Sequence, residues 1–358
     1  MSKEGQKRNV VIVGGGYAGA LLARSLSGSL NPHKYNLILI NERPFAIHLL
    51  AGARMTVSEE GNFEHLAVMP YDNLFINGNG RVVVGRVTEI EETAKGKGGW
   101  VVLQSGPLDF PYSRQEMHEH IQYWRRMYER ANHIVLIGGG AVGIETAGEL
   151  RDVYPNKKIT IVQADDMLLN PTYPTKYRKD IEKRVRARKI DMVFSELTDY
   201  IPQYGTMGLT TRSGMSLPTA DLIVPTFGPR PNTKWIASLG PDVLDERRLV
   251  KVEPTFEVVN HPGVFAIGDI TDCNEQKQAL KYTTHATVAA ANILSFLEGR
   301  PRTKKYKGST EIILIPIGKR RGSAYFDILW GIVLGDWFVR WLKGGDLVVN
   351  QTRRDRGL

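Results

Sequence analysis

Short apolar runs of strand length recur along the first 300 residues, separated by stretches with helical periodicity. Residues 10–13, 37–40, 134–137 and 159–162 are apolar apart from one threonine. A run without polar alternation is typical of a parallel strand that is buried on both faces. The runs at 10–13 and 134–137 each lead into a helical pattern and then into the next apolar run, at 37–40 and 159–162. The pattern therefore predicts two β-α-β units in an α/β fold.

A glycine-rich run follows the first strand and reads Gly14, Gly15, Gly16, Tyr17, Ala18, Gly19. Gly14 permits a tight turn, Gly16 lets the backbone approach a pyrophosphate, and Gly19 allows the helix to pack closely on the strand. The N-terminus of that helix then faces the phosphates. Asn41 and Glu42 end the next strand, where an amide or a carboxylate can hydrogen-bond a ribose hydroxyl.

The same spacing returns at Gly138, Gly140 and Gly143. One such run is a weak signal because glycines also gather in ordinary turns, but two copies, each between a strand and a helix, predict two dinucleotide sites. The strand that follows ends at Gln163, which does not repel a 2′-phosphate as an acidic residue would. The sequence therefore leaves the choice between NADH and NADPH open.

Two later segments favour a flavin at the first site. Residues 264–269 form an apolar strand that ends in Gly268 and Asp269, and the carboxylate can hold a ribityl hydroxyl; an aspartate that caps a turn is the alternative. His285 lies at the start of an alanine-rich helix whose positive end can face the flavin ring. Residues 221–232 are interpreted as a buried strand and a turn back into the flavin domain.

With these motifs, the chain resembles the pyridine nucleotide-disulfide oxidoreductases, and within them the apoptosis-inducing-factor-like group. Residues 51–54, 140–145, 267–269, 285–286 and 341–347 carry the resemblance. It implies two Rossmann-like dinucleotide-binding domains, glutathione-reductase-like in arrangement, and a small C-terminal α+β domain. The expected boundaries are 1–113 with 236–304 for FAD, 114–235 for NAD(P)H, and 305–358 for the basic, aromatic-rich C-terminal segment.

The resemblance also implies an activity and its residues. NAD(P)H passes a hydride to FAD, and FAD reduces a quinone-like acceptor. The residues implied for FAD include Arg54, Val87 and Asp269 beside the first glycine run; the turn at Gly228 is a further cofactor position. The implied catalytic residues are Glu145, near the nicotinamide, and Lys343, near the flavin edge. The single cysteine, Cys273, excludes the disulfide-reducing members.

One departure from the class concerns the flavin domain. A strand that ends in Ala-Thr-Gly normally precedes the second glycine run, but here residues 108–113 lead directly into a polar, helix-like stretch at 114–121. The strand normally closes the domain beside the cofactor. Its absence supports an alternative function, a catalytically impaired nucleotide-binding or interaction protein.

The net charge of +9 belongs almost entirely to the C-terminal end. Residues 299–358 contain 13 Lys and Arg against 5 Asp and Glu, and three of the six tryptophans. Read as a helix, residues 325–342 align Trp330, Leu334, Trp337, Phe338 and Trp341 in one stripe, with three charges that make a membrane-spanning helix unfavourable. The stripe packs on the flavin domain or contacts a membrane surface through aromatic and basic residues. Residues 352–356 are interpreted as a solvated tail.

The remaining features indicate location and partners. Residues 1–9 contain no apolar signal segment, and Ser2 excludes N-myristoylation. We expect a cytoplasmic protein with peripheral contact to an intracellular membrane, such as a lipid droplet or the mitochondrial outer surface. A specific nucleic-acid partner is not expected, because the charge is confined to one segment. His48, His118 and His120 lack the neighbours of a metal site, so no metal is predicted. The oligomeric state is left open.

Overall fold

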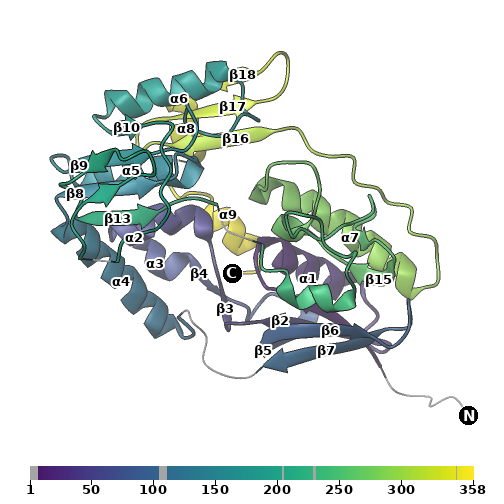
Figure 1. Ribbon diagram of the computed structural model, residues 1–358. Helices are drawn as coiled ribbons and strands as arrows, with labels where there is room; N and C mark the ends of the chain where they lie inside the picture. The colour runs from purple at the N-terminus through teal and green to yellow at the C-terminus, as the bar shows by residue number, and fades with distance from the viewer. Residues whose placement is uncertain (1–6, 105–110, 204, 229–230, 344) are drawn as a thin grey trace, which may run out of the picture.

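The computed structural model describes residues 7–104, 111–203, 205–228, 231–343 and 345–358, apart from the side chain of Lys343. Two Rossmann-like domains lie side by side, and the C-terminal residues pass between them (Figure 1). The class is α/β, as predicted. No helix in the described ranges is long and apolar enough to cross a membrane.

In the first domain, β2 (Tyr35–Asn41) lies between β1 (Arg8–Val13) and β5 (Arg81–Val84) in a parallel sheet. Leu37 and Leu39 of β2 pack in one cluster with α1 (Tyr17–Ser29) and α7 (Tyr282–Leu297). Because side chains alternate along a strand, Ile38 and Ile40 point to the opposite face. There they meet Val87 of β6 (Arg86–Glu92), which forms a hairpin with β7 (Gly99–Gln104).

The strand β1 is less buried than its sequence predicts. Val11 is 37% exposed, and Val10 and Val13 are half-buried. In the described ranges β1 pairs with β2 on one side, and no strand pairs with its other edge. The expected burial on both faces was therefore wrong for β1, because it is an edge strand. The sequence contains no Ala-Thr-Gly strand before residue 114, and the described residues 111–113 form no strand; residues 105–110 lie outside the described ranges.

The later strand of this domain begins and ends earlier than predicted. β15 (His261–Phe265) pairs antiparallel with β14 (Glu257–Val258) and ends before the Gly268–Ile270 turn. The chain then enters α7, as the alanine-rich pattern indicates.

In the second domain, the parallel sheet has the order β10-β9-β8-β13. Its strands are β8 (His133–Ile137), β9 (Lys158–Val162), β10 (Asp191–Val193) and β13 (Leu222–Pro225), and its helices are α4 (Arg114–Arg130), α5 (Ala141–Val153) and α6 (Thr175–Ala187). All five residues of β8 are buried. Ser113 and Glu116 form a reciprocal capping box that begins α4, so the polar stretch at 114–121 is a helix.

The C-terminal segment forms an antiparallel sheet of β16 (Ile312–Pro316), β17 (Gly322–Phe326) and β18 (Ile332–Leu334), followed by α8 (Asp336–Lys343) and α9 (Val349–Arg354). Ile315 and Ile317 belong to the main core of the second domain. The segment is α+β, as predicted, but it shares that core instead of standing apart.

A single helix over residues 325–342 was a wrong prediction. Leu329, Trp330 and Gly331 have φ angles of 47°, 67° and 83°, which a right-handed helix does not contain. The chain therefore turns between β17 and β18, and the helix begins at Asp336. The expected stripe is divided: Trp330, Trp337 and Trp341 are exposed, whereas Leu334 and Phe338 pack beside a small cluster around Val339. Its buried part packs on the C-terminal sheet rather than on the flavin domain.

The interpretation of residues 352–356 as a solvated tail was also wrong. Figure 1 shows α9 between the two domains. Leu347 and Val349 join a cluster with α2 (Gly52–Val57) and α3 (Phe63–Leu66). Thr352 is 2% exposed and Arg356 is 4% exposed. Leu347 and Val349 anchor this part of the chain, and Arg356 is drawn inward, whereas Arg354 stays exposed.

Candidate functional site

The first glycine run has the geometry that a phosphate loop needs. Gly14 has a φ of +95°, and its N–H donates to the carbonyl of Ile40 at 2.8 Å. A Cβ at Gly19 would lie 1.9 Å from the Gly14 oxygen, so the helix packs closely on the strand only because Gly19 is glycine. A Cβ at Gly16 would meet nothing within 4 Å, and no side chain caps α1. The backbone N–H groups at this helix end are thus left open to an anion.

The residues after β2 support this loop. The Asn41 side-chain oxygen accepts from the Gly15 N–H at 2.9 Å, and its amide nitrogen donates to the Arg43 carbonyl at 2.9 Å. The Asn41 amide, which the sequence analysis predicts to hydrogen-bond a ribose hydroxyl, therefore also holds the loop. Glu42 is half-buried and pairs with Arg86 at 3.0 Å, and a carboxylate retains capacity for further donors.

The Gly268–Asp269 turn meets the same loop. Gly268 has a φ of +81°, and a Cβ there would lie 3.0 Å from the Cβ of Ala18. Its N–H donates to His285 Nδ1 at 3.3 Å, which leaves Nε2 to donate to Glu275 at 2.9 Å. Burial lowers the pKa of His285, so the ring is a neutral support for the turn. Tyr282 donates to Asp269. The first glycine run thus meets two later segments, the Gly268–Asp269 turn and the start of α7.

The second glycine run repeats this construction. Gly138 has a φ of +120°, and its N–H donates to the Val162 carbonyl at 2.9 Å. A Cβ at Gly143 would lie 2.0 Å from the Gly138 oxygen, whereas a Cβ at Gly140 would meet nothing within 4 Å. Gln163 accepts from the Gly139 N–H at 2.7 Å, as Asn41 does in the first loop. Its amide is thus part of the loop, and its side chain also reaches Asp165 and the Met167 carbonyl.

The turn after β13 closes the second loop from the other side. Thr226 donates to the carbonyls of Ile137 and Gly138 at 3.1 and 2.9 Å. A Cβ at Gly138 would lie 2.9 Å from the Phe227 nitrogen. Gly228 follows directly, exposed and with open space around it, and the Phe227 side chain is 62% exposed. The structure therefore places Gly228 beside the second loop.

A buried ion pair holds α2 against α5. Arg54 of α2 donates to Glu149 of α5 through two nitrogens, at 3.0 and 2.8 Å, and to the Gly345 carbonyl at 3.2 Å. Both side chains are nearly fully buried, and burial raises the pKa of Glu149 against the opposing effect of Arg54. Arg54 therefore ties α2, which lies in the sequence between β2 and β5 of the first domain, to a helix of the second domain. Its implied contact with FAD stays a prediction.

The two implied catalytic residues come from different elements. Glu145 is half-buried on α5, two residues after Gly143 and one turn before Glu149. Lys343 is the last residue of α8, and its side chain lies outside the described part of the structure. Their implied catalytic roles stay predictions.

One residue of the first loop region was missed by the sequence analysis. The Tyr71 hydroxyl donates to the Gly15 carbonyl at 2.8 Å. It occupies the space above that glycine, because a Cβ at Gly15 would lie 2.1 Å from it. Tyr71 is 56 residues from Gly15 and belongs to no motif, so no local signal identifies it.

A cluster of possible metal ligands was also missed. Donor atoms of Glu64, His65 and His118 lie within 4.8 Å of one another, because α3 and α4 bring them together. The expectation that His118 lacks such neighbours was therefore wrong. Glu64 already pairs with Arg125, and a divalent cation would stand beside that guanidinium. We assign no metal to this cluster.

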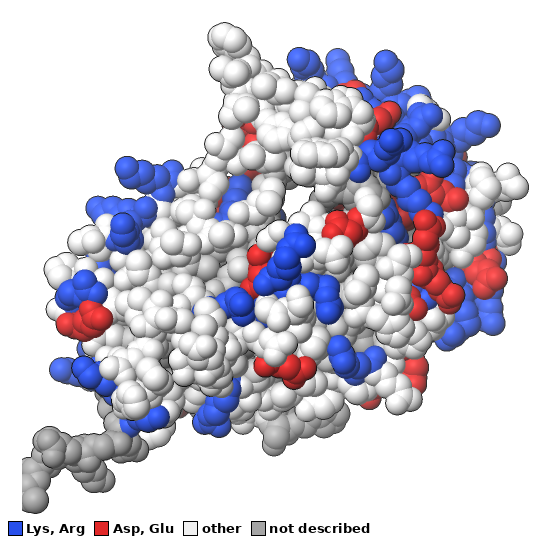
Figure 2. Space-filling view, turned by 180° about the vertical axis from the view of Figure 1, so that it is seen from behind, with Lys and Arg blue, Asp and Glu red and all other residues white. Residues whose placement is uncertain are grey.

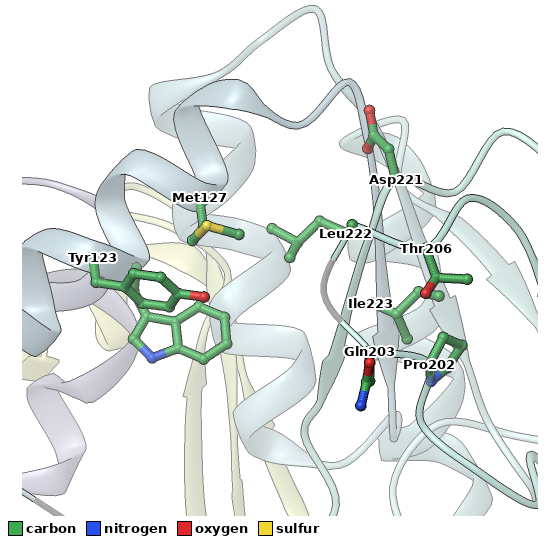
Figure 3. A pocket seen from close by; sticks show the side chains of 10 residues that line it. Tyr123, Met127, Pro202, Gln203, Thr206, Asp221, Leu222 and Ile223 are labelled. Carbon is green, nitrogen blue, oxygen red and sulfur yellow. The ribbon is translucent and has the colours of Figure 1, made fainter.

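A small cavity lies away from both loops (Figure 3). Tyr123 and Met127 of α4 face Leu222 and Ile223 of β13 across a volume of about 60 Å³. A nucleotide or a quinone needs several hundred Å³. The cavity is therefore not the cofactor site.

Comparison with known proteins decides the family. The profile of the pyridine nucleotide-disulphide oxidoreductases matches residues 8–291, which include both glycine runs and the Gly268–Asp269 turn. The chain belongs to this family. Pyridine nucleotide-disulphide oxidoreductases bind FAD and NAD(P)H, and two loops with open helix ends provide two dinucleotide sites.

Several members of the family are similar over nearly their whole length. The FAD-dependent oxidoreductase FVFD30 of Flammulina velutipes is 41% identical, over 84% of this chain and 98% of its own. Apoptosis-inducing factor homolog B of Dictyostelium discoideum is 28% identical, and ferroptosis suppressor protein 1 of Xenopus tropicalis 26%, each over 97% of this chain and 96% of its own. The chain is thus an apoptosis-inducing-factor-like member and an FAD-dependent oxidoreductase.

Solved structures show the same fold. The sulfide:quinone oxidoreductase of Aquifex aeolicus superposes with a TM-score of 0.73 at 15% identity, over 97% of this chain and 92% of that one. The ferredoxin reductase for the CYP199A2 system of Rhodopseudomonas palustris gives 0.65 at 20% identity, over 89% and 88%. The C-terminal segment is included in the first of these matches, because that match covers nearly the whole chain.

Proposed function

We propose that this oxidoreductase passes a hydride from NAD(P)H to FAD and electrons onward to a quinone-like acceptor at a membrane surface. The observation that carries the proposal is the pair of open glycine loops in a chain with a single cysteine. When bound, FAD supplies the hydride-accepting chemistry, and the protein positions the two nucleotides.

FAD is assigned to the first loop because the Gly268–Asp269 turn and the start of α7 meet it. NAD(P)H is assigned to the second loop, where Glu145 lies on the first turns of the same helix. The Arg54–Glu149 ion pair holds α2 against α5, the helix that begins at the second loop. Fixed placement of two reactants is a large part of the catalytic effect in hydride transfer.

The acceptor is inferred from what the protein lacks and from its fold. Reduction of a disulfide needs a second cysteine, and Cys273 stands alone. Burial also raises the pKa of the Cys273 thiol, which keeps it protonated and unreactive. A small diffusing acceptor therefore fits this chain better than a disulfide does. A quinone is such an acceptor, and one solved structure with this fold is a sulfide:quinone oxidoreductase.

Contact with a membrane is inferred from one exposed face. Trp330, Trp337 and Trp341 are 102%, 70% and 75% exposed, and Leu329 is 75% exposed. In Figure 2 an uncharged projection rises beside a field of basic residues. Helix α6 adjoins α8 through Arg184 and Asp336, and it exposes several basic side chains: Lys176, Lys179, Lys183 and Arg186.

This combination suits the surface of an anionic bilayer. Exposed tryptophans lie at the headgroup level, and each basic residue near such a surface contributes about 1 kcal/mol. A quinone dissolves in the bilayer, so membrane contact brings the enzyme to its acceptor. We place the protein in the cytoplasm on an intracellular membrane, such as a lipid droplet or the mitochondrial outer surface.

Turnover with a quinone distinguishes this function from its alternative. The alternative is a nucleotide-binding protein with impaired catalysis. The observation that favours it is the exposed edge of β1, with which no described strand pairs. The test is steady-state oxidation of NADH and of NADPH with a water-soluble quinone, and with a long-chain quinone in anionic vesicles. We expect turnover with both acceptors. Stabilisation by nucleotides without turnover would establish the alternative.

A further inference from the structure

Arg356 is a buried cation with unused hydrogen-bonding capacity. It follows α9, is 4% exposed, and its Nε and Nη1 atoms have no hydrogen-bond partner in the described part of the chain. A guanidinium carries five N–H donors and stays charged in proteins. Buried donors of this kind are nearly always paired, so two unpaired nitrogens indicate an acceptor that comes from outside the chain.

The surroundings of Arg356 place it at the first glycine loop. The Tyr71 hydroxyl bonds the Gly15 carbonyl, and burial raises the pKa of Tyr71 to about 12, an effect that the charge and hydrogen bonding of Arg356 oppose. The charge of Arg356 also opposes the rise that burial causes in the pKa of Tyr17, at the start of α1. Asp355, the residue before Arg356, accepts from the Tyr17 hydroxyl, so the guanidinium lies close to residues 15–17. Arg43 adds a second positive charge near Tyr71.

The acid next to Arg356 does not provide the missing acceptor. Asp355 accepts from the Tyr17 hydroxyl at 3.3 Å and from the Gln351 amide at 2.8 Å. Arg356 thus follows a residue that bonds Tyr17, the first residue of α1, and two of its own nitrogens have no acceptor among the described residues. A diphosphate fits this position, because it has the opposite charge and several acceptor oxygens that suit the planar guanidinium.

We propose that Arg356 binds the pyrophosphate of FAD. The inference rests on the assignment of FAD to the first loop. It makes the last residues of the chain part of the flavin site: α9 is held between the domains, and the residue after Asp355 closes over the cofactor. Retention of FAD then depends on the C-terminal segment as well as on the glycine run.

The test compares Arg356→Met with Arg354→Met. Arg354 is exposed, belongs to α9 and bonds only Gln351 among the described residues, so its variant removes the same charge from the same region. For Arg356→Met we expect the dissociation constant of FAD to rise at least about tenfold, as for loss of a buried charge pair. Binding of riboflavin, which has no phosphate, should not change. Arg354→Met should bind both flavins like the wild type.

The midpoint of thermal unfolding without flavin separates binding from structure. Methionine buries no unpaired donor, so the apoprotein of Arg356→Met should unfold at the wild-type temperature or above it. Inorganic pyrophosphate should raise the unfolding midpoint of the wild type less than FAD does. An equal rise would show that Arg356 belongs to a site for free anions, and it would overturn the proposal. Wild-type affinity for FAD in Arg356→Met, or an equal loss of FAD and riboflavin with a lowered midpoint, would overturn the proposal. Failure of the wild type to bind FAD would overturn the proposed function as well.

Discussion

Replacement of Gly140 by alanine separates the function of the second loop from the fold. Gly140 has φ −77° and ψ −175°, which any residue adopts, and an added Cβ meets nothing within 4 Å. Alanine restricts the unfolded chain, which stabilises by about 0.4–1 kcal/mol, but it is a poorer N-cap than glycine by a similar amount. The two effects nearly cancel. We therefore expect the free energy of unfolding to change by less than about 1 kcal/mol.

Binding of NAD(P)H should respond quite differently. The new methyl group occupies the space through which the pyrophosphate approaches the backbone, and forced overpacking costs about 1–3 kcal/mol. This corresponds to a rise of about 5- to 150-fold in the KM for NAD(P)H. The assay is steady-state kinetics, together with the FAD content and the urea midpoint of the same preparation.

The neighbouring glycine supplies the control. Gly143→Ala puts a Cβ 2.0 Å from the Gly138 oxygen, so it should disturb folding as well as binding. An unchanged KM for Gly140→Ala at full stability would refute the reasoning, because it would show that no phosphate approaches this loop. Loss of FAD instead of NAD(P)H would show that the two sites are assigned the wrong way round.

Three further predictions follow from single observations. Trp337→Ser with Trp341→Ser should abolish sedimentation with anionic vesicles and leave turnover of a soluble quinone unchanged; unchanged sedimentation would contradict the membrane face. Glu149→Leu should lower the free energy of unfolding in urea by about 3–5 kcal/mol, because it leaves the buried Arg54 guanidinium without its carboxylate. Arg54→Met should lower that free energy less, since Glu149 can take up a proton. The double variant should recover part of the loss. Burial lowers the pKa of His285 below its unfolded value of about 6.5, so the unfolded state is protonated first and stability is lost as the pH falls below about 6.5. His285→Gln should reduce this dependence in thermal unfolding between pH 7 and 5, and an identical pH profile would count against it.

The motifs were predictable from the sequence because their chemistry is local. Gly14 and Gly19 are required by a turn and by a close helix contact, and both requirements show in the spacing alone. The same holds for Gly138 and Gly143. The strands beside them, β1 included, were identified from apolar runs. The burial of β1 was not predictable, because the burial of an edge strand depends on a neighbour that the pattern does not reveal.

The supporting residues were not predictable, because they act across the sequence. Asn41 and Gln163 were predicted as residues near the nucleotides, and the structure adds that each side chain accepts a hydrogen bond from its own glycine loop. Tyr71 reaches Gly15 from 56 residues away. Arg356 looks like part of a solvated tail, and it is buried only because the apolar residues before it are anchored between the domains. Such roles follow from tertiary contacts, not from periodicity.

The most direct test of the account is an anaerobic absorbance titration of the purified protein. The wild type should show a bound flavin spectrum, lose it on addition of about one equivalent of NADH or NADPH, and regain it when a soluble quinone is added. The nucleotide that bleaches the flavin at lower concentration also identifies the preferred donor. A protein without flavin absorbance, or a flavin that neither nucleotide reduces, would contradict the account.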